Sequence, residues 1–324
     1  MEFAVVGAGL LGLSTARALR KRGRDVVLYE RSTVGNERSG SKGSSRIFRL
    51  GYTDPRYVTM AIEAQAHWRD LEDEAGQPLL DPTGQVSFGA QMDDLLRALT
   101  EAGAPALAIS AREAQERFPE LNVRGDAIYE PQSAVIDAAA TLAALRRSVG
   151  ESLREGEAVR SLADLDAKTV IVCAGPFTKT LVDIPTRATR EHVAYFQHRS
   201  GTLPAMPIFI HYREPAVYGL PTPSLDAYKL AFHHAGEAVD PESISMEPDP
   251  SAVVAIEQAA ALRLPNFEPR AVHAEACLYD NTADEHFIVE RRDNVVIGAG
   301  TSGHAFKFGP LLGERLARLA LDDT

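Results

Sequence analysis

The amino-acid sequence predicts an α/β fold: a mostly parallel sheet covered by helices, joined to a second domain built on a mixed sheet. Three observations support this prediction. Residues 3–30 run as a strand, a glycine-rich turn, a helix and a second strand, which is the order of a βαβ unit. Residues 169–175 and 294–300 both repeat a short apolar strand that ends in glycine. We therefore expect one layer assembled from distant segments, with the second domain inserted between them.

A net charge of −11 over 324 residues argues against nucleic acid and against a polybasic membrane anchor, because both need a basic face. The length predicts about two domains. No run of 18 apolar residues occurs, and the apolar segment 3–6 leaves no room for a secretion signal, so we expect a cytoplasmic protein without membrane contact. The two cysteines, Cys173 and Cys277, are too few for a disulfide framework or a zinc site.

The first unit has the clearest pattern. Its helix follows from Leu13, Ala16 and Leu19, which are spaced by three, and its second strand covers residues 26–29. The later elements follow from apolar periodicity and from the positions of glycine and proline. They are, in order, a helix over 57–74, a strand over 85–88, helices over 92–101, 111–117 and 138–148, strands broken by prolines over 190–235, a helix over 248–262, and a final helix with Leu312, Leu316 and Leu319 on one face.

This order of elements also predicts the domain boundaries. The strand-plus-glycine segments belong together, so we expect residues 1–75, 131–185 and 270–324 to form the nucleotide-binding domain. The intervening residues 76–130 and 186–269 are then expected to form the second domain, which would hold the substrate.

The turn after the first strand fits the motif G-x-G-x-x-G with Gly7, Gly9 and Gly12. These glycines permit a tight turn, close approach of the backbone to a pyrophosphate, and close packing of helix on strand. Glu30 ends the next strand, where a carboxylate can accept hydrogen bonds from ribose hydroxyls. The motif favours a bound dinucleotide without distinguishing NAD from FAD, and a turn of this shape without a ligand is the alternative.

Three separate segments point to one family. Cys277 begins Cys-Leu-Tyr-Asp-Asn-Thr, and residues 294–308 continue through Gly300, Gly303 and Lys307. The other two segments are residues 218–233 and residues 43–52, which read Gly-Ser-Ser-Arg-Ile-Phe-Arg-Leu-Gly-Tyr. These segments, and their order along the chain, closely resemble monomeric sarcosine oxidase and its N-methyl-tryptophan and pipecolate oxidase relatives, in the D-amino-acid-oxidase superfamily. The resemblance covers nearly the whole chain and implies FAD as the cofactor.

The resemblance implies a role for individual residues. Cys277 stands where the family forms a thioether to the flavin 8α-methyl group. Arg49 and Lys307 stand where the substrate carboxylate is bound, with Ser45 in place of the usual threonine. Lys229 stands where a lysine, through a water near flavin N5, promotes reaction with O2. Side chains with further implied roles are Arg46 on the flavin side of the site and His233, Tyr218 and Tyr279 around the substrate.

These roles agree with elementary chemistry. Arginine offers a carboxylate two parallel hydrogen bonds, and a cation beside the flavin lowers the barrier to forming superoxide. Lys307 directly precedes the final helix, whose N-terminus favours negative charge on a reduced flavin. The residues that we expect to contact the cofactor are Gly7, Gly9, Leu10, Leu11, Gly12, Glu30, Arg31, Ser45, Arg46, Cys173, Ala174, Gly175, Cys277, Gly300, Gly303 and Lys307.

Each residue also has a plainer interpretation. Cys277 alone would be a buried structural thiol, Cys173 on its apolar strand is expected to pack in the core, and a lone cation is usually solvated. His233 and His234 are adjacent on a strand, so we expect them to face opposite ways, with His233 toward the substrate. His286 and His304 are expected to be structural. The acidic segment 280–285 lacks the spacing of a calcium loop, so no metal is predicted.

Together these points predict an FAD-dependent enzyme that oxidises a small secondary amine amino acid, of the sarcosine, N-methyl or cyclic imino acid type. Hydride transfer to flavin N5 would give an imine, and O2 would be reduced to H2O2. A dehydrogenase with another electron acceptor and a non-catalytic flavin-binding module are the alternatives. We expect a monomer, and the sequence does not name the amine. The segment 150–169 is short for the family, which predicts that part of a peripheral β-layer is missing.

Overall fold

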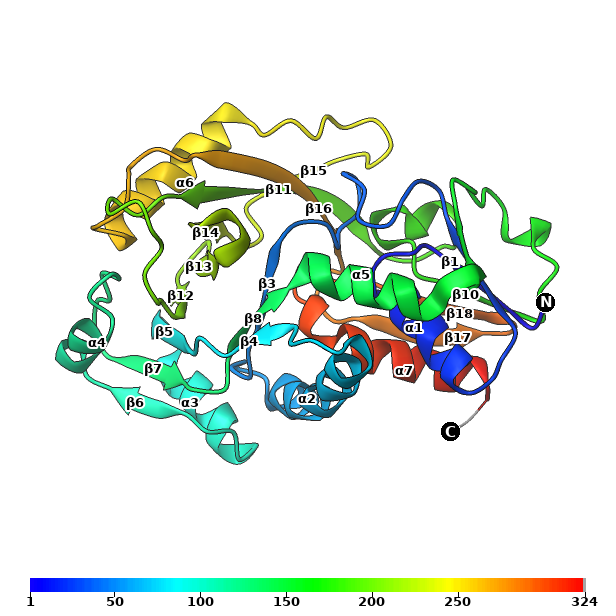
Figure 1. Ribbon diagram of the computed structural model, residues 1–324, viewed down its shortest axis with the longest axis horizontal. Helices are drawn as coiled ribbons and strands as arrows, with labels where there is room; N and C mark the ends of the chain where they lie inside the picture. Colours follow the sequence, from blue (N-terminus) through cyan, green and yellow to red (C-terminus); the bar gives the residue numbers. More distant parts are fainter. Residues whose placement is uncertain (323–324) are drawn as a thin grey trace.

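The computed structural model describes residues 1–322, and its first sheet joins segments from both ends of the chain (Figure 1). The strand order is β17-β18-β10-β1-β2-β9. Strands β2, β1, β10 and β18 pair in parallel, and β17 is antiparallel at the edge. This confirms a mostly parallel layer built from distant segments. The strands are β1 (Phe3–Val6), β2 (Val26–Glu30), β9 (Leu153–Glu155), β10 (Thr169–Val172), β17 (Ile288–Arg292) and β18 (Val295–Ala299).

Three helices pack together against this sheet: α1 (Leu10–Lys21), α5 (Ala138–Val149) and α7 (Gly309–Ala320) (Figure 1). Leu13 and Leu19 of α1 are fully buried, as their spacing predicted. Helix α7 approaches α1 closely because Gly313 has no side chain, and a Cβ there would overlap Ser14. The chain from β9 to β10 contains only the short 3₁₀ turn η2 (Leu162–Asp164) as a helix.

A second, larger sheet is mixed, as predicted. Its order is β15-β11-β14-β13-β12-β5-β7-β6, with β16 also paired to β11. Only β12 and β5 pair in parallel, and the other pairs are antiparallel. Helix α6 (Pro250–Arg263) packs on β11 and β14. The strands are β5 (Gln85–Gly89), β6 (Leu107–Ile109), β7 (Ala127–Glu130), β11 (Arg187–Phe196), β12 (Ile208–Tyr212), β13 (Val217–Thr222), β14 (Ala227–Phe232), β15 (Glu237–Ala238) and β16 (His273–Asn281).

A small third sheet lies between the other two in Figure 1. Strand β8 (Ala134–Asp137) pairs with both β3 (Ser45–Phe48) and β4 (Leu80–Asp81). Strand β3 carries part of the motif over residues 43–52, so this sheet places that motif beside the first sheet. The remaining elements are α2 (Pro55–Ala75), α3 (Met92–Glu101), α4 (Ala111–Arg117), η1 (Gly150–Ser152), η3 (Gly175–Thr180), η4 (Pro223–Leu225) and η5 (Phe306–Phe308).

Two helices begin at residues that their capping side chains determine, and apolar periodicity had predicted slightly different starts. Helix α2 begins at Pro55 because the Asp54 side chain accepts from the Arg56 amide. Helix α6 begins at Pro250 in the same way, with Asp249 accepting from the amides of Ser251 and Ala252. Proline suits the first helical position because its missing N–H has no partner there. The predicted starts at 57 and 248 were therefore two residues off in opposite directions.

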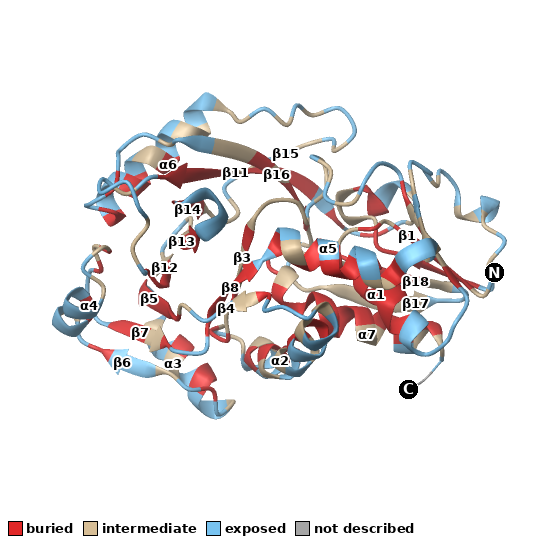
Figure 2. Ribbon diagram, in the orientation of Figure 1, coloured by how far each residue is buried: buried red, intermediate tan, exposed pale blue. Residues whose placement is uncertain are grey.

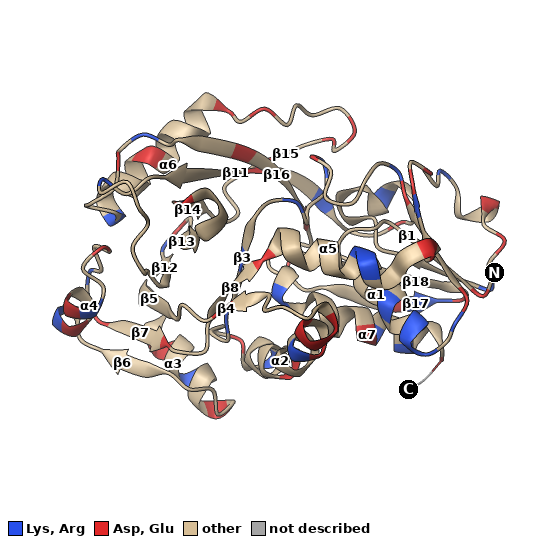
Figure 3. Ribbon diagram, viewed as in Figure 1, with Lys and Arg blue, Asp and Glu red and all other residues tan. Residues whose placement is uncertain are grey.

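Buried residues line the strands and the inner faces of the helices, whereas charged residues lie mainly on outer helix faces and loops (Figures 2 and 3). Some charged side chains are exceptions, and among them Lys229 and Lys307 are each 4% exposed and Glu130 is fully buried. A buried charge is costly unless it is paired or hydrogen-bonded, so these exceptions mark where function is to be sought. Within residues 1–322, no helix is long and apolar enough to cross a bilayer.

Candidate active site

One cavity of about 690 Å³ runs from the glycine turn of the first sheet to the inner face of the mixed sheet. It brings together residues that lie far apart in sequence, because β1, β3, β14 and β16 all contribute to its wall. All six side chains predicted to be catalytic line it: Arg46, Arg49, Tyr218, Lys229, His233 and Lys307.

The glycine turn has the shape that a pyrophosphate needs. Gly7 has φ +97°, and a Cβ there would lie 2.5 Å from the Cys173 carbonyl oxygen. A Cβ on Gly12 would overlap the Gly7 carbonyl oxygen. Helix α1 starts with Gly9 as an N-cap without a side-chain hydrogen bond, and its first turn has no acidic residue. The Leu10 amide donates to the neutral Ser41 hydroxyl at 2.9 Å, so no acidic residue of the helix opposes a phosphate at its N-terminus.

The acid at the end of β2 is fixed against the same turn. Glu30 accepts hydrogen bonds from the amides of Ala8 and Ser32, both at 3.0 Å, and it lines the cavity. Arg31 also lines the cavity, but its guanidinium forms two hydrogen bonds to Glu242, at 2.7 and 2.8 Å. Sequence reasoning missed Glu242, because a residue more than 200 positions away in a loop carries no local signal.

Most of the other predicted cofactor contacts also line the cavity. These are Gly7, Gly9, Leu10, Leu11, Ser45, Arg46, Cys173, Ala174, Gly175, Cys277, Gly303 and Lys307. Gly12 and Gly300 lie behind the cavity wall instead. Gly300 donates its amide to Asp280 at 2.7 Å, and a Cβ on it would lie 2.6 Å from Thr282. Gly300 thus shapes the turn after β18, and its contact with the cofactor stays a prediction.

Cys277 lies on β16 and lines the cavity near several cations. Burial raises the pKa of the Cys277 thiol, and the positive charges of Lys229, Arg46 and Lys42 oppose that rise. Cys173 has no such neighbours, and burial raises the pKa of its thiol to about 12. Because the thiolate is the nucleophile, Cys277 is the better placed of the two for covalent chemistry.

Lys229 projects from β14 into the same region. Its Nζ donates to the Ser45 carbonyl oxygen at 3.2 Å, and Arg46 donates to the same oxygen at 2.9 Å. Burial and, secondarily, the charge of Arg46 lower the pKa of Lys229 to about 7. The Ser45 hydroxyl is held by Thr222 at 2.8 Å. Lys229 is therefore a buried amine whose charge changes near neutral pH.

Arg49 and Lys307 form a pair of cations whose hydrogen-bond partners are neutral. Arg49 donates to the Gly51 carbonyl and to the Tyr212 hydroxyl, both at 2.8 Å. Lys307 donates to the Tyr52 hydroxyl and to the His304 carbonyl, also both at 2.8 Å. Burial lowers the pKa of Lys307 well below its usual value, and Arg49 lowers it further. An anionic ligand between the two side chains would oppose this lowering and favour the charged form of Lys307, so the pair is suited to a carboxylate.

Tyr52 links the two cations, and sequence reasoning missed its role. The Arg49 guanidinium lies 4.3 Å from the centroid of the Tyr52 ring, and the Tyr52 hydroxyl accepts from Lys307. Its position in the motif over residues 43–52 was the available signal. Tyr212, on β12, was missed as well because no motif surrounds it.

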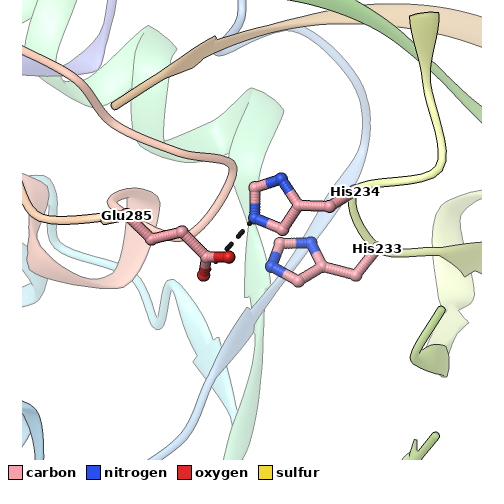
Figure 4. Close-up of side chains that lie close together, drawn as sticks. All are labelled: His233, His234 and Glu285. Atoms are coloured by element: carbon pink, nitrogen blue, oxygen red, sulfur yellow. Dashed lines mark ion pairs between the residues drawn. The ribbon is translucent and has the colours of Figure 1, made fainter. Parts of the chain in front are cut away.

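The predicted opposite orientation of His233 and His234 is wrong. Strand β14 ends at Phe232, so both histidines lie beyond the strand, and His234 has a left-handed backbone with φ +57°. Their rings lie side by side (Figure 4), with 4.0 Å between centroids. Both ring centroids lie 5.8 Å from that of Tyr279. The alternation that holds inside a strand does not extend past its last residue. His233 does line the cavity.

His233, His234 and Glu285 are the one group in residues 1–322 that could hold a metal ion, with ligand atoms within 4.8 Å of one another. His234 Nε2 lies 3.5 Å from a Glu285 carboxylate oxygen (Figure 4). Burial lowers the pKa of His233 well below its usual value, and the positive charges around it, including Arg49 and Lys307, lower it further. The same positive charges would repel a divalent cation. The three residues are therefore better suited to an ion pair between His234 and Glu285 beside a neutral His233.

A glycine turn on a parallel sheet shares one cavity with a cation-lined mixed sheet, and this arrangement defines a dinucleotide-dependent enzyme with an anion-binding site. Comparison with known proteins identifies the family. Residues 2–319 match the DAO family, described as FAD dependent oxidoreductase. The chain belongs to this family, which confirms the resemblance drawn from its motifs.

The most similar relatives include peroxisomal sarcosine oxidase of Homo sapiens, 31% identical over 99% of this chain and 92% of the relative. Monomeric sarcosine oxidase of Streptomyces avermitilis is 30% identical over 99% and 93%. Among solved structures, the amino acid oxidase NikD superposes with a TM-score of 0.87, at 23% identity, over 100% of this chain and 94% of NikD. The NikD match confirms the fold class.

Proposed function

We propose that this FAD-dependent oxidoreductase oxidises a small amino acid with a secondary amine. The observation that carries the proposal is the pair formed by Arg49 and Lys307, because these cations face the cofactor cavity with only neutral oxygens as hydrogen-bond acceptors. A substrate carboxylate would accept charge-assisted hydrogen bonds from both side chains. That sarcosine oxidases are among the relatives supports this substrate class.

The remaining cavity residues suit the amine end of such a substrate. Tyr218, Tyr279 and His233 form an aromatic wall, with His233 6.4 Å from Tyr218 and 5.8 Å from Tyr279 between ring centroids. Since burial and nearby cations keep the pKa of His233 low, this histidine is neutral at pH 7. A neutral wall favours the uncharged amine, which is the form that can lose a hydride.

Bound FAD supplies the two-electron acceptor at flavin N5. The substrate loses two electrons and two protons to become an imine, O2 takes them up to become H2O2, and water hydrolyses the imine. Lys229 is placed to assist O2, because a cation stabilises the charge that develops when O2 accepts an electron. A lysine in this position favours the oxidase over a dehydrogenase with another acceptor. We further propose that the enzyme is a cytoplasmic monomer.

The cavity suits FAD both where the pyrophosphate and ribose would bind and where the flavin ring would lie. The glycine turn and the N-terminus of α1, whose first turn has no acidic residue, suit the pyrophosphate, and Glu30 suits the ribose. Cys277 lies in the cavity wall beside Lys229 and Arg46. We propose that Cys277 bonds to the flavin 8α-methyl group, because neighbouring cations favour the thiolate that such a bond requires.

Replacing Cys277 with alanine is expected to release the flavin from denatured protein. Wild-type protein should stay yellow after acid precipitation, and its mass should exceed that of the chain by one FAD. The Cys277→Ala variant should give a colourless precipitate and a yellow supernatant. The matched control is Cys173→Ala, which should keep the flavin attached. A colourless wild-type precipitate contradicts covalent attachment.

A peroxide assay over a panel of secondary amino acids tests the proposed function directly. We expect H2O2 with at least one N-methyl or cyclic imino acid, and little with the matching amine that lacks a carboxylate. Flavin reduction under anaerobic conditions, without reoxidation by O2, would identify a dehydrogenase. Yellow protein whose flavin no amine reduces would identify a flavin-binding module and refute the proposal.

A further inference from the structure

Glu130, the last residue of β7, is a fully buried carboxylate that no step of the proposed reaction uses. Both of its oxygens receive hydrogen bonds. One accepts from the Gln85 amide nitrogen at 2.7 Å and the Ser87 hydroxyl at 3.3 Å, and the other accepts from the Gly51 amide at 2.7 Å and the Ser133 hydroxyl at 3.4 Å. Burial raises the pKa of Glu130, whereas the charge of Arg49 and the hydrogen bonds from Gly51, Ser87 and Gln85 oppose that rise and favour the ionised carboxylate.

Gly51 connects this carboxylate to the proposed substrate site. Its amide donates to Glu130, and its carbonyl accepts from Arg49 at 2.8 Å. A Cβ on Gly51 would overlap a Glu130 oxygen, so glycine is required for the close approach. Among the three groups that most raise the pKa of Arg49, which are Tyr212, Tyr52 and Glu130, only Glu130 is a carboxylate.

We infer that Glu130 is the counter-charge of the carboxylate-binding site, where it holds Arg49 charged and in place and limits how tightly the site binds an anion. The inference rests on the proposed function, in which Arg49 binds the substrate carboxylate. A buried cation without a counter-charge is unstable in the empty site. It also binds any anion more tightly, because the ligand then supplies all of the compensating charge. Glu130 keeps the empty site stable and its hold on a carboxylate moderate.

Glu130→Gln tests the charge with little change of shape. The buried Gln85 amide oxygen has no hydrogen-bond partner, so rotation of that amide would let it accept from the new glutamine while Gly51 keeps its acceptor. In the holoenzyme we expect the Kd of acetate, measured by calorimetry, to fall about tenfold. That factor corresponds to one charge removed at roughly 10 Å with an effective dielectric constant of about 20. The ligand-free Tm should fall, and saturating acetate should raise it more than in the wild type.

Ser87→Ala is the matched control, because it removes one hydrogen bond to Glu130 and keeps the charge. Its acetate Kd should stay within about twofold of the wild type. Weaker or unchanged acetate binding by Glu130→Gln would overturn the inference, since a merely structural role lowers affinity and stability together. If that variant does not fold, Gln85→Lys provides the test: the Gln85 amide nitrogen lies 2.7 Å from Glu130, so an ammonium group there would neutralise the carboxylate. Acetate should then bind more tightly, and an unchanged Kd overturns the inference.

The failure of this inference and that of the proposed function can be told apart. If no amine is oxidised but acetate binds the wild type, the acetate titrations still test Glu130. If amino acids are oxidised but their KM does not fall in Glu130→Gln along with the acetate Kd, the role of Glu130 is refuted and the proposed function stands.

Discussion

Arg49→Ala is expected to weaken carboxylate binding by about 30- to 4,000-fold. The loss of one partner from a desolvated ion pair typically costs about 2–5 kcal/mol, and about 1.4 kcal/mol corresponds to a factor of ten. The variant should lose the flavin spectral changes that carboxylate inhibitors produce, while FAD stays bound. Lys307 would remain in the site, but it donates to Tyr52 and His304 and presents a point charge rather than a planar fork.

Two comparisons separate carboxylate binding from a general defect. Arg49→Lys should restore binding only in part, because an ammonium group cannot form two parallel hydrogen bonds to a carboxylate. Amines that lack a carboxylate should be poor substrates for the wild type and almost unaffected by Arg49→Ala. A wild-type enzyme that oxidises such an amine as well as the corresponding acid would contradict the proposed role of Arg49 and, with it, the amino-acid substrate class.

Lys229→Met is expected to slow reoxidation of the flavin by O2 about 10²- to 10³-fold while reduction by substrate stays close to the wild-type rate. Removal of a preorganised charge from a developing anion typically has an effect of this size. Methionine is an unbranched side chain that lacks the terminal ammonium group, so it suits this buried position, where Lys229 is 4% exposed. Stopped-flow measurements of the two half-reactions check the prediction. If the reductive half-reaction collapses instead, Lys229 is a substrate contact and the assignment to O2 is wrong.

The pH dependence of reoxidation provides an independent check on Lys229. Burial and the charge of Arg46 lower its pKa to about 7. Below that pH the side chain is a cation and assists O2, and above it the charge is lost. The wild-type reoxidation rate should therefore fall as the pH rises through about 7. The Lys229→Met variant should show no such step, and the same step in both enzymes would assign the titration to another group.

The sequence by itself determined the fold class and most of the candidate site. The glycine turn at Gly7 and the strands that end in glycine at residues 175 and 300 were predictable, because turn geometry and apolar runs are local properties of the chain. The motifs around Arg49, Lys229 and Cys277 were also local, and their order identified the family. All of the predicted catalytic residues line the same cavity.

Only the tertiary structure decided how residues from separate elements meet. Glu130 on β7 holds Gly51 and thereby Arg49, and Glu242 pairs with Arg31 from a distant loop. The course of the chain beyond β14, where it is no longer extended, brings His233 and His234 together. These contacts depend on the relative placement of two sheets and on one backbone torsion angle. Periodicity and motifs describe neighbours along the chain, and the partners in these contacts are neighbours only in space.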